Sequence, residues 1–186
     1  MKKAILIITL CYSFIITFAQ NAPVYSDTNR TLDERIEDAL SKMTLEEKVA
    51  MCHAQSRFSS PGVPRLGIPE LWLADGPNGV REELVWDDWI SARQTNDSCT
   101  AFPALTCLAA TWNPQLAYEF GKALGEESRY REKDVILGPG INIYRTPLNG
   151  RNFEYMGEDP HLISALCVPY IQGVQVNGVA ACIKHM

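Results

Sequence analysis

Short apolar runs alternate with segments of helical spacing through the second half of the chain. The predicted strands are LWLA (71–74), ALTCLAA (104–110), VILGPGINIY (135–144), which continues into a loop, and VAACI (179–183). The predicted helices cover residues 114–130 and 160–175, the first opened by Asn113-Pro114 and the second bent or broken at Pro169. This alternation favours a parallel α/β sheet, most simply a barrel. Because so few strands cannot close an eight-stranded barrel, we expect the N-terminal portion of a (β/α)8 barrel-like domain, incomplete in this chain.

The first 30 residues have the composition of a leader and a linker. Met1-Lys2-Lys3 is positively charged, residues 4–18 are apolar, and small residues precede Gln20, as in a secretory signal peptide over residues 1–19. The alternative, a transmembrane anchor, needs roughly 20 apolar residues, more than this run supplies. We therefore expect export to the periplasm or the extracellular medium, no stable membrane anchor, a linker at 20–30 and a folded domain at 31–186.

Two capping boxes open this folded part. Thr31-x-x-Glu34 precedes LDERIEDALSKM, and Thr44-x-x-Glu47 precedes LEEKVAMC. In a capping box the Thr hydroxyl and the Glu carboxylate accept hydrogen bonds from backbone N–H groups that the helix itself cannot satisfy. The sequence therefore predicts two helices in close succession.

The charge of the chain excludes some partners. Without residues 1–19, which contain Lys2 and Lys3, 15 basic and 22 acidic residues remain, a formal charge of −7. A chain this acidic, with no basic cluster, is a poor ligand for nucleic acid or anionic lipid. Neutral or cationic small molecules stay possible.

The cysteines and histidines indicate neither a disulfide framework nor a metal site. Five cysteines follow the leader, mostly in apolar runs, and we expect them to be mainly buried thiols: Cys52, Cys99, Cys107, Cys167 and Cys182. No CxxC occurs, and His53, His161 and His185 lack the spacing of metal ligands. We predict no zinc site and no cofactor.

A carboxylate follows the first predicted strand directly. Asp75 comes after LWLA, the sequence Gly-Pro-Asn-Gly then turns the chain, and Arg81 lies six residues further on. In parallel α/β folds functional residues gather at the carboxyl ends of strands, so Asp75 and Arg81 are candidates for one pocket. The alternative is an Asx-turn, in which Asp75 bonds only its own loop.

A long glycine-rich loop follows the third predicted strand. It carries Arg145, Arg151, Glu154, Glu158 and Asp159. Loops of this length are often functional, and a loop arginine can bind hydroxyls or a carboxylate in a forked geometry. The alternative is an ion-pair network within the loop, which best suits Glu158 and Asp159; Asp159 is also a natural N-cap before Pro160.

The last predicted strand is followed by Lys184 and His185. If VAACI is a buried strand, this pair emerges at the same opening as Asp75. The alternative is a solvated tail. The buried strand argues against that alternative, because the pair would then lie over a core.

These stretches together resemble glycoside hydrolase family 3, near its β-glucosidases, over residues 33–186. The resemblance rests on the LEEKV helix, RLGIPELWLADGPNGVR, TAFPALTCLAATWNPQLAYEFGKALGEESR, ILGPGINIYRTPLNGRNFEYMGEDP and GVAACIKH, in that order. In that family the catalytic domain is a barrel or a close variant. It removes a terminal non-reducing β-glycosyl residue in carbohydrate metabolism by a retaining mechanism.

The resemblance also implies roles for residues. It makes Asp75 the carboxylate that bonds hydroxyls of the terminal sugar, and Arg81, Arg151, Lys184 and His185 further donors around that sugar. The nucleophilic Asp and the acid/base Glu lie further along the chain in the family, beyond the end of this one. We therefore expect a fragment that contains no catalytic carboxyl, is inactive by itself, and binds a β-linked glucoside or oligosaccharide in the full-length parent.

Three other functions stay open at this point. A lysine at a strand end is also how Schiff-base aldolases place their nucleophile, with His185 serving in proton transfer. Within the family, an N-acetylglucosaminidase-like subgroup also continues from a Lys–His pair, although DGPNGVR and GRNFE favour the glucosidase side. A non-catalytic sugar-binding remnant is the third, and its open strand edge predicts self-association.

Overall fold

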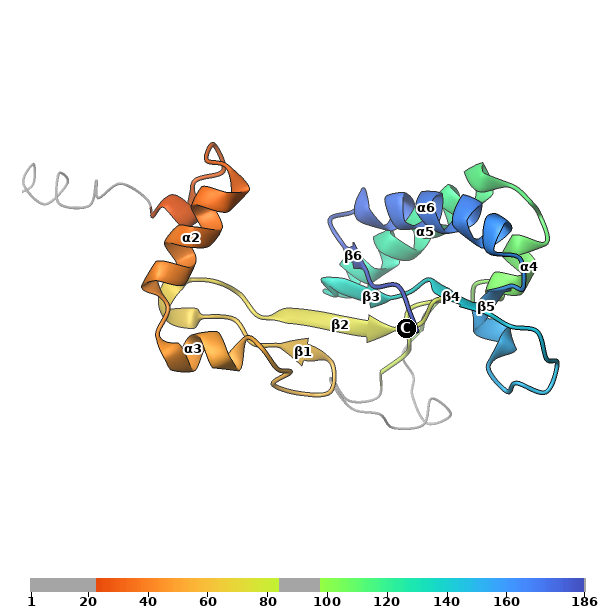
Figure 1. Cartoon of the computed structure of the whole chain (residues 1–186), viewed down its shortest axis with the longest axis horizontal. Coiled ribbons are helices and arrows are strands. Elements are labelled where there is room, and N and C mark those ends of the chain that lie inside the picture. The colour runs from red at the N-terminus through yellow and green to blue at the C-terminus, as the bar shows by residue number, and fades with distance from the viewer. Residues whose placement is uncertain (1–22, 84–97, 186) are drawn as a thin grey trace, which may run out of the picture. The chain divides into compact units, whose positions relative to one another are not determined.

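The computed structural model describes residues 23–83 and 98–185, which divide into two compact units with a boundary after Val49 (Figure 1). The predicted signal peptide lies outside the described residues. The first unit contains the 3-10 helix η1 (Val24–Ser26) and the helix α2 (Leu32–Lys42), and α3 (Leu45–Ala50) begins in it. Within the described residues, no helix is both long and apolar enough to cross a bilayer.

Both predicted capping boxes are confirmed. Glu34 N–H donates to Thr31 Oγ1 at 3.3 Å, and Thr31 N–H donates to Glu34 Oε2 at 3.0 Å. The pair Thr44 and Glu47 makes the same two bonds, at 3.2 and 2.8 Å. Part of the predicted linker also packs on α2, because Tyr25 N–H donates to the Asp38 carboxylate at 3.0 Å.

The second unit is built on a mainly parallel sheet. Its strands are β1 (Ser59–Ser60), β2 (Leu71–Asp75), β3 (Val135–Leu137) and β6 (Ala180–Ala181), in the spatial order β1-β2-β3-β6. Strands β2, β3 and β6 are parallel, and β1 pairs antiparallel with β2. The parallel α/β arrangement predicted from the sequence is therefore confirmed for this unit.

Two long helices connect the parallel strands. The helix α5 (Pro114–Tyr130) lies between β2 and β3 in the sequence, and α6 (Pro160–Gln175) lies between β3 and β6. The predicted start of α5 at Asn113-Pro114 is confirmed, and the Asn113 side chain caps the helix by accepting from Leu116 N–H at 3.1 Å. Helix α6 continues through Pro169 as one element.

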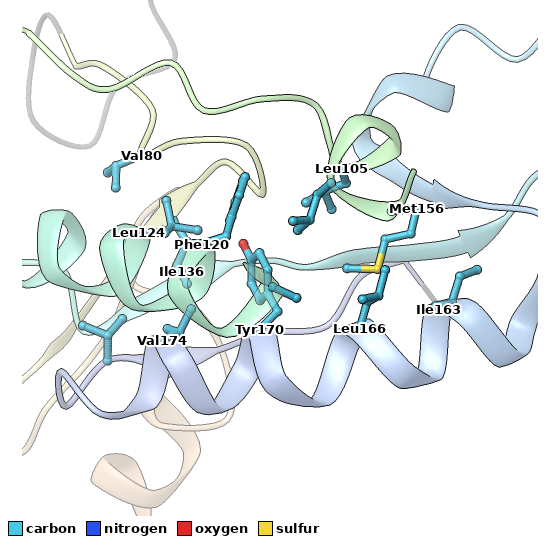
Figure 2. Close-up of a cluster of buried hydrophobic side chains, with 14 of the residues drawn as sticks. Val80, Leu105, Phe120, Leu124, Ile136, Met156, Ile163, Leu166, Tyr170 and Val174 are labelled. Carbon is cyan, nitrogen blue, oxygen red and sulfur yellow. The ribbon is translucent and has the colours of Figure 1, made fainter. Parts of the chain in front are cut away.

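The core lies where α5, α6 and β3 meet (Figure 2). Leu124 of α5, Ile136 of β3, and Tyr170 and Val174 of α6 are all completely buried there. Fully burying a large aliphatic side chain contributes about 1.5–3 kcal/mol. The helices α5 and α6 therefore share one apolar core with β3.

The strand predicted at ALTCLAA is wrong. Residues Leu105–Ala109 form the helix α4. Leu105, Leu108 and Ala109 are buried at positions i, i+3 and i+4, which is one face of a helix, and Ala and Leu favour helix over strand. A short apolar run does not by itself distinguish a strand from a buried helix.

The expectation of mainly buried thiols is also wrong. Among the described residues, the five cysteines form no disulfide with one another, and of these five only Cys167 is buried. Cys107 shows the reason: it lies on α4 between two buried leucines and faces away from the core. An apolar run folded as an amphipathic helix exposes one face.

A second, two-stranded sheet lies beside the ends of the first. It pairs β4 (Gly140–Ile143) with β5 (Tyr155–Gly157), and the 3-10 helix η4 (Asn152–Glu154) leads into β5. A further 3-10 helix, η2 (Pro64–Leu66), precedes β2. Beyond the short β6, Lys184 N–H donates to Pro139 O at 3.1 Å and Ile141 N–H donates to Lys184 O at 2.8 Å. These bonds fix the backbone of Lys184.

Candidate functional site

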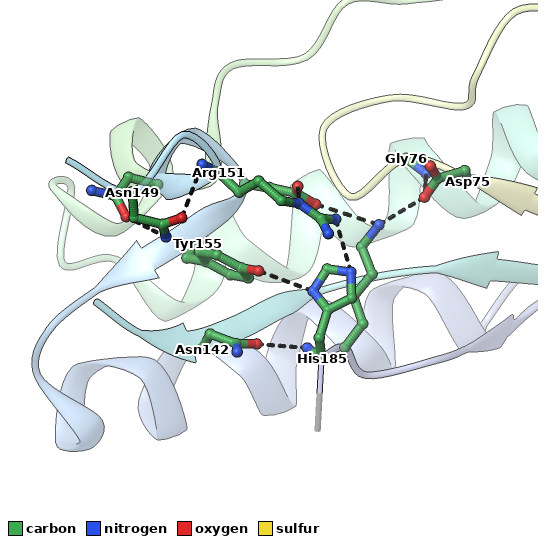
Figure 3. Close-up of polar contacts among 10 residues, drawn as sticks. Asp75, Gly76, Asn142, Asn149, Arg151, Tyr155 and His185 are labelled. Atoms are coloured by element: carbon green, nitrogen blue, oxygen red, sulfur yellow. Dashed lines mark hydrogen bonds and ion pairs between the residues drawn. The ribbon is translucent and has the colours of Figure 1, made fainter. Parts of the chain in front are cut away.

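Polar side chains from three distant segments meet at the carboxyl ends of β2 and β6 (Figure 3). Asp75 is the last residue of β2, Lys184 follows β6, and Arg151 and Glu154 come from the segment that contains η4. Because β2, β3 and β6 are parallel, their carboxyl ends share one edge of the sheet, and residues 109 positions apart come within bonding distance.

Lys184 lies between two carboxylates. Its Nζ is 2.7 Å from Asp75 Oδ1 and 3.5 Å from Glu154 Oε2. The exposed side-chain fractions are 12% for Lys184, 26% for Asp75 and 8% for Glu154. Gly76 N–H also donates to Asp75 Oδ1, at 2.9 Å. Charged hydrogen bonds screened from water in this way are stronger than surface ion pairs.

Glu154 is held as a carboxylate. Its Oε1 accepts a hydrogen bond from Arg151 Nε. Burial raises the pKa of Glu154, but the bond from Arg151 and the charge of Lys184 outweigh burial, so its pKa is below the ordinary value. The same bond to Glu154 raises the pKa of Arg151. Glu154 is therefore suited to orient the two cations and not to donate a proton.

The contacts of His185 determine its tautomer. Arg151 Nη2 lies 2.9 Å from His185 Nε2, and a guanidinium can only donate, so Nε2 accepts. The proton of the neutral ring is then on Nδ1, which lies 3.0 Å from the Tyr155 hydroxyl. The backbone N–H of His185 donates to Asn142 Oδ1 at 2.6 Å. Burial, then the charges of Arg151 and Lys184, lower the pKa of His185, which favours this neutral form.

The charges of this cluster cancel. Two carboxylates, one ammonium and one guanidinium surround a neutral imidazole. An array of charged hydrogen-bond partners with no net charge suits a neutral ligand rich in hydroxyl groups. Among residues 23–83 and 98–185, no group of three or more His, Cys, Asp or Glu side chains is arranged to hold a metal ion.

Four of the five predicted site residues join this network. For the fifth, Arg81, the structure shows a different setting: its guanidinium carbon lies 5.6 Å from the centroid of the Phe58 ring. Its backbone N–H donates to Asp75 O at 2.9 Å and closes the loop after β2. Arg81 thus shapes the loop that bears Asp75.

Three residues of the network were not predicted as site residues. Glu154 was assigned to the loop, although its i, i+3 spacing from Arg151 and its position before β5 could have indicated the ion pair. Tyr155 and Asn142 contact His185 through the fold, and no local pattern indicates them. The expected N-cap role of Asp159 is confirmed, since its carboxylate accepts from His161 N–H at 2.9 Å.

Comparison with protein families decides where this chain belongs. The family model described as "Glycosyl hydrolase family 3 N terminal domain" matches residues 42–186. The chain belongs to glycoside hydrolase family 3. This confirms the resemblance drawn from the sequence motifs.

Among family 3 proteins, several relatives are similar over most of this chain. Beta-glucosidase BoGH3A of Bacteroides ovatus is 64% identical over 96% of the chain, which spans 25% of that protein. Thermostable beta-glucosidase B of Acetivibrio thermocellus is 43% identical over 81% of the chain, which spans 20% of that protein. The chain therefore spans a quarter or less of the length of these relatives.

Solved family 3 structures share the fold. The structure of beta-glucosidase 3B from Thermotoga neapolitana in complex with glucose matches with a TM-score of 0.72 and 41% identity, over 81% of this chain and 22% of that one. DesR, a beta-glucosidase from Streptomyces venezuelae in complex with D-glucose, matches with a TM-score of 0.71 and 38% identity, over 82% and 19%. The α/β fold is that of the N-terminal, barrel-like domain of family 3 β-glucosidases, of which this chain spans a part.

Proposed function

We propose that the full-length protein hydrolyses terminal non-reducing β-D-glucosyl residues by a retaining mechanism, and that this chain supplies part of its sugar-binding pocket. The observation that carries the proposal is the placement of Lys184 between Asp75 and Glu154 at the strand ends. The relatives named as β-glucosidases, and the related structures described in complex with glucose, support it.

In this proposal Asp75 accepts hydrogen bonds from the sugar. Both bonds that described residues make to its carboxylate, from Lys184 Nζ and Gly76 N–H, end at Oδ1. The second oxygen is thus available to accept bonds from adjacent hydroxyls. A charged acceptor held in this way binds hydroxyls more strongly than a neutral one and discriminates against analogues that lack them.

The cations donate to the same sugar. Arg151 uses Nε for Glu154 and Nη2 for His185, which leaves further N–H groups of its half-exposed guanidinium for hydroxyls. Lys184 has a third N–H beyond the two directed at carboxylates. His185 and Arg81 complete the proposed binding set, Arg81 through the loop it closes.

No residue of the cluster serves as nucleophile or acid/base in this proposal. Retaining hydrolysis needs two carboxyls roughly 5–5.5 Å apart, one of which donates a proton. Glu154 is unsuited to donate a proton, because its pKa is lowered and its carboxylate is bonded to two cations. The proton donor therefore comes from outside this cluster, and the resemblance to family 3 implies that the nucleophilic Asp also lies further along the parent chain. The chemistry needs no metal or cofactor.

The ion pairing of Lys184 argues against the aldolase alternative. A Schiff base would remove the bonds that its ammonium makes to Asp75 and Glu154. For location, we propose export through residues 1–19 to the periplasm or the extracellular medium, which the charge and length of that segment support.

The test is hydrolysis of nitrophenyl glycosides by the full-length protein. We expect nitrophenol release from the β-D-glucoside, none from the α-D-glucoside, and a first product of β configuration by NMR. Asp75→Asn should lower kcat/KM for the β-glucoside roughly 10- to 100-fold, the equivalent of losing a charged hydrogen bond. Asp27→Asn, a matched change far along the chain, should leave kcat/KM unchanged. Absence of release from every terminal β-glycoside would overturn the proposal.

A further inference from the structure

A buried tyrosine hydroxyl reaches the loop that bears Asp75. Tyr170 lies in α6 with 0% of its surface exposed, and its hydroxyl donates to the backbone carbonyl of Pro77 at 2.9 Å. The two residues are 93 positions apart in the chain. The ring is packed against Phe120, with centroids 5.7 Å apart (Figure 2). The hydroxyl is therefore held in one place.

The loop between Asp75 and Arg81 has little freedom of its own. Besides the bond from Arg81 N–H to Asp75 O, Phe102 N–H donates to Asn78 O at 3.0 Å. Gly79 has a φ of +141°, and a Cβ there would lie 2.4 Å from the Thr100 carbonyl oxygen. These contacts join the two ends of the loop and fix Asn78 and Gly79 against residues 100–102. The position of Pro77 then depends on its own hydrogen bond.

The end of β3 leaves room for the tyrosine contact. A Cβ at Gly138 would lie 3.0 Å from the Tyr170 hydroxyl and 3.0 Å from Pro77 Cα. The absence of a side chain at Gly138 therefore allows α6, β3 and the loop to meet at one point. Burial raises the pKa of Tyr170, so its hydroxyl stays neutral and continues to donate.

We propose that Tyr170 is a positioning residue for sugar binding, because its hydroxyl anchors Pro77 and so holds the loop that orients Asp75. The proposal rests on the function proposed above. Replacing the hydroxyl by hydrogen would leave a buried carbonyl without its donor. A buried unpaired carbonyl is unfavourable, so the loop would shift to rehydrate it and move Asp75 away from its bonding geometry.

The test compares Tyr170→Phe with Tyr130→Phe in the 186-residue chain. Both lose one hydroxyl, but Tyr130 is almost fully exposed. Hydrogen exchange reports on the loop through the amides of Arg81 and Phe102, and on the sheet through the amide of Cys182, which donates to Ile136 O at 2.9 Å. A titration with glucose reports on the site.

In Tyr170→Phe we expect the loop amides to exchange about 3- to 10-fold faster, the Cys182 amide to be unchanged, and the dissociation constant for glucose to rise by a similar factor. Tyr130→Phe should match the wild type in all three. Equal acceleration of loop and sheet amides would indicate a merely structural role and overturn the proposal. Unchanged exchange, or faster loop exchange with unchanged glucose affinity, would overturn it as well.

If the proposed function is wrong, the experiment gives a result that differs from all of those above. If the wild-type chain does not bind glucose, the sugar-site assignment is wrong, and the exchange data alone judge the anchoring role. Selective acceleration of the Arg81 and Phe102 amides in Tyr170→Phe would then support Tyr170 as the anchor of this loop, and any other pattern would overturn it.

Discussion

At the scale of single residues, the proposed sugar site depends on Lys184 as the cation shared by two carboxylates. Its Nζ contacts both Asp75 and Glu154, and its side chain is almost buried. Arg151 and His185 extend the same network on the other side of Glu154. Each member therefore restricts the positions of the others, so we expect a change at any one residue to alter the contacts of all of them.

Replacing Lys184 by methionine should destabilise the chain. The change leaves Asp75 without its cation and Glu154 with one cation fewer, which we expect to lower the free energy of unfolding by about 1–3 kcal/mol. Urea unfolding measures it. The matched control is Lys42→Met, which removes an exposed i, i+4 pair with Asp38 and should cost no more than about 0.5 kcal/mol. Equal losses in the two variants would contradict the shared-cation role.

The pKa of His185 predicts a pH dependence of stability. Because its folded pKa lies below the ordinary 6.5, the unfolded chain binds this proton first, and stability is lost as the pH falls from about 6.5 through the folded value. The contribution of Glu154, whose pKa is lowered from 4.5, is lost only at still lower pH. Unfolding free energies at pH 5 and 7.5 should thus differ more in the wild type than in His185→Gln. In the control His161→Gln, at an exposed histidine, the unfolding free energy should differ between the two pH values by as much as in the wild type. If His185→Gln also shows the full wild-type difference, His185 is not the group responsible for it.

At the scale of elements, the helices α5 and α6 approach each other through glycines. A Cβ at Gly121 of α5 would lie 2.0 Å from the Tyr170 carbonyl oxygen, and one at Gly173 of α6 would lie 2.1 Å from the Tyr118 carbonyl oxygen. Backbone-to-backbone contact of this kind leaves no room for a side chain. This close contact sets the position of α6, and with it the position of Tyr170.

Gly121→Ala should therefore separate the two helices. We expect the free energy of unfolding to fall by roughly 1–3 kcal/mol, as for other overpacked cores. Gly150→Ala is the matched control, because nothing lies within 4 Å of a Cβ there, and it should change stability by less than about 0.5 kcal/mol. Urea midpoints of the two variants that agree within error would show that the helices do not depend on this contact.

The elements also show what sequence reasoning could and could not predict. Local signals were sufficient for the capping boxes at Thr31 and Thr44 and for the Asn113-Pro114 start of α5. They failed at α4, whose five residues are too few for periodicity to separate helix from strand. The positions of Asp75 and Lys184 directly after predicted strands indicated both as site residues, because the carboxyl ends of parallel strands lie at one edge of the sheet. Partners such as Tyr155 could not be found, since only the folded chain places them beside His185.

At the scale of the whole molecule, the parallel connection of β2, β3 and β6 is what produces a site. It brings the residue that ends β2 to the one that follows β6, although they are 109 positions apart. In the function proposed above, this edge of the sheet binds the terminal sugar.

The 186-residue chain by itself should bind glucose without hydrolysing glucosides. The carboxylates of the cluster, Asp75 and Glu154, are both bonded to cations, and the pKa of Glu154 is lowered, so neither is suited to protonate a leaving group. Nitrophenol release from the β-D-glucoside by the purified chain, at a rate above the uncatalysed reaction, would show that the cluster itself is catalytic.

The most direct test of the central claim is an NMR titration of this chain with glucose, run beside Asp75→Ala. We predict saturable shifts of the amides of Gly76, Arg151 and His185 in the wild type. We predict no glucose-dependent shifts in Asp75→Ala, whose amides outside the cluster keep their wild-type positions and so show that the variant is folded. No shift in the wild type, or equal shifts in Asp75→Ala, would contradict the claim that these strand ends form a sugar-binding pocket.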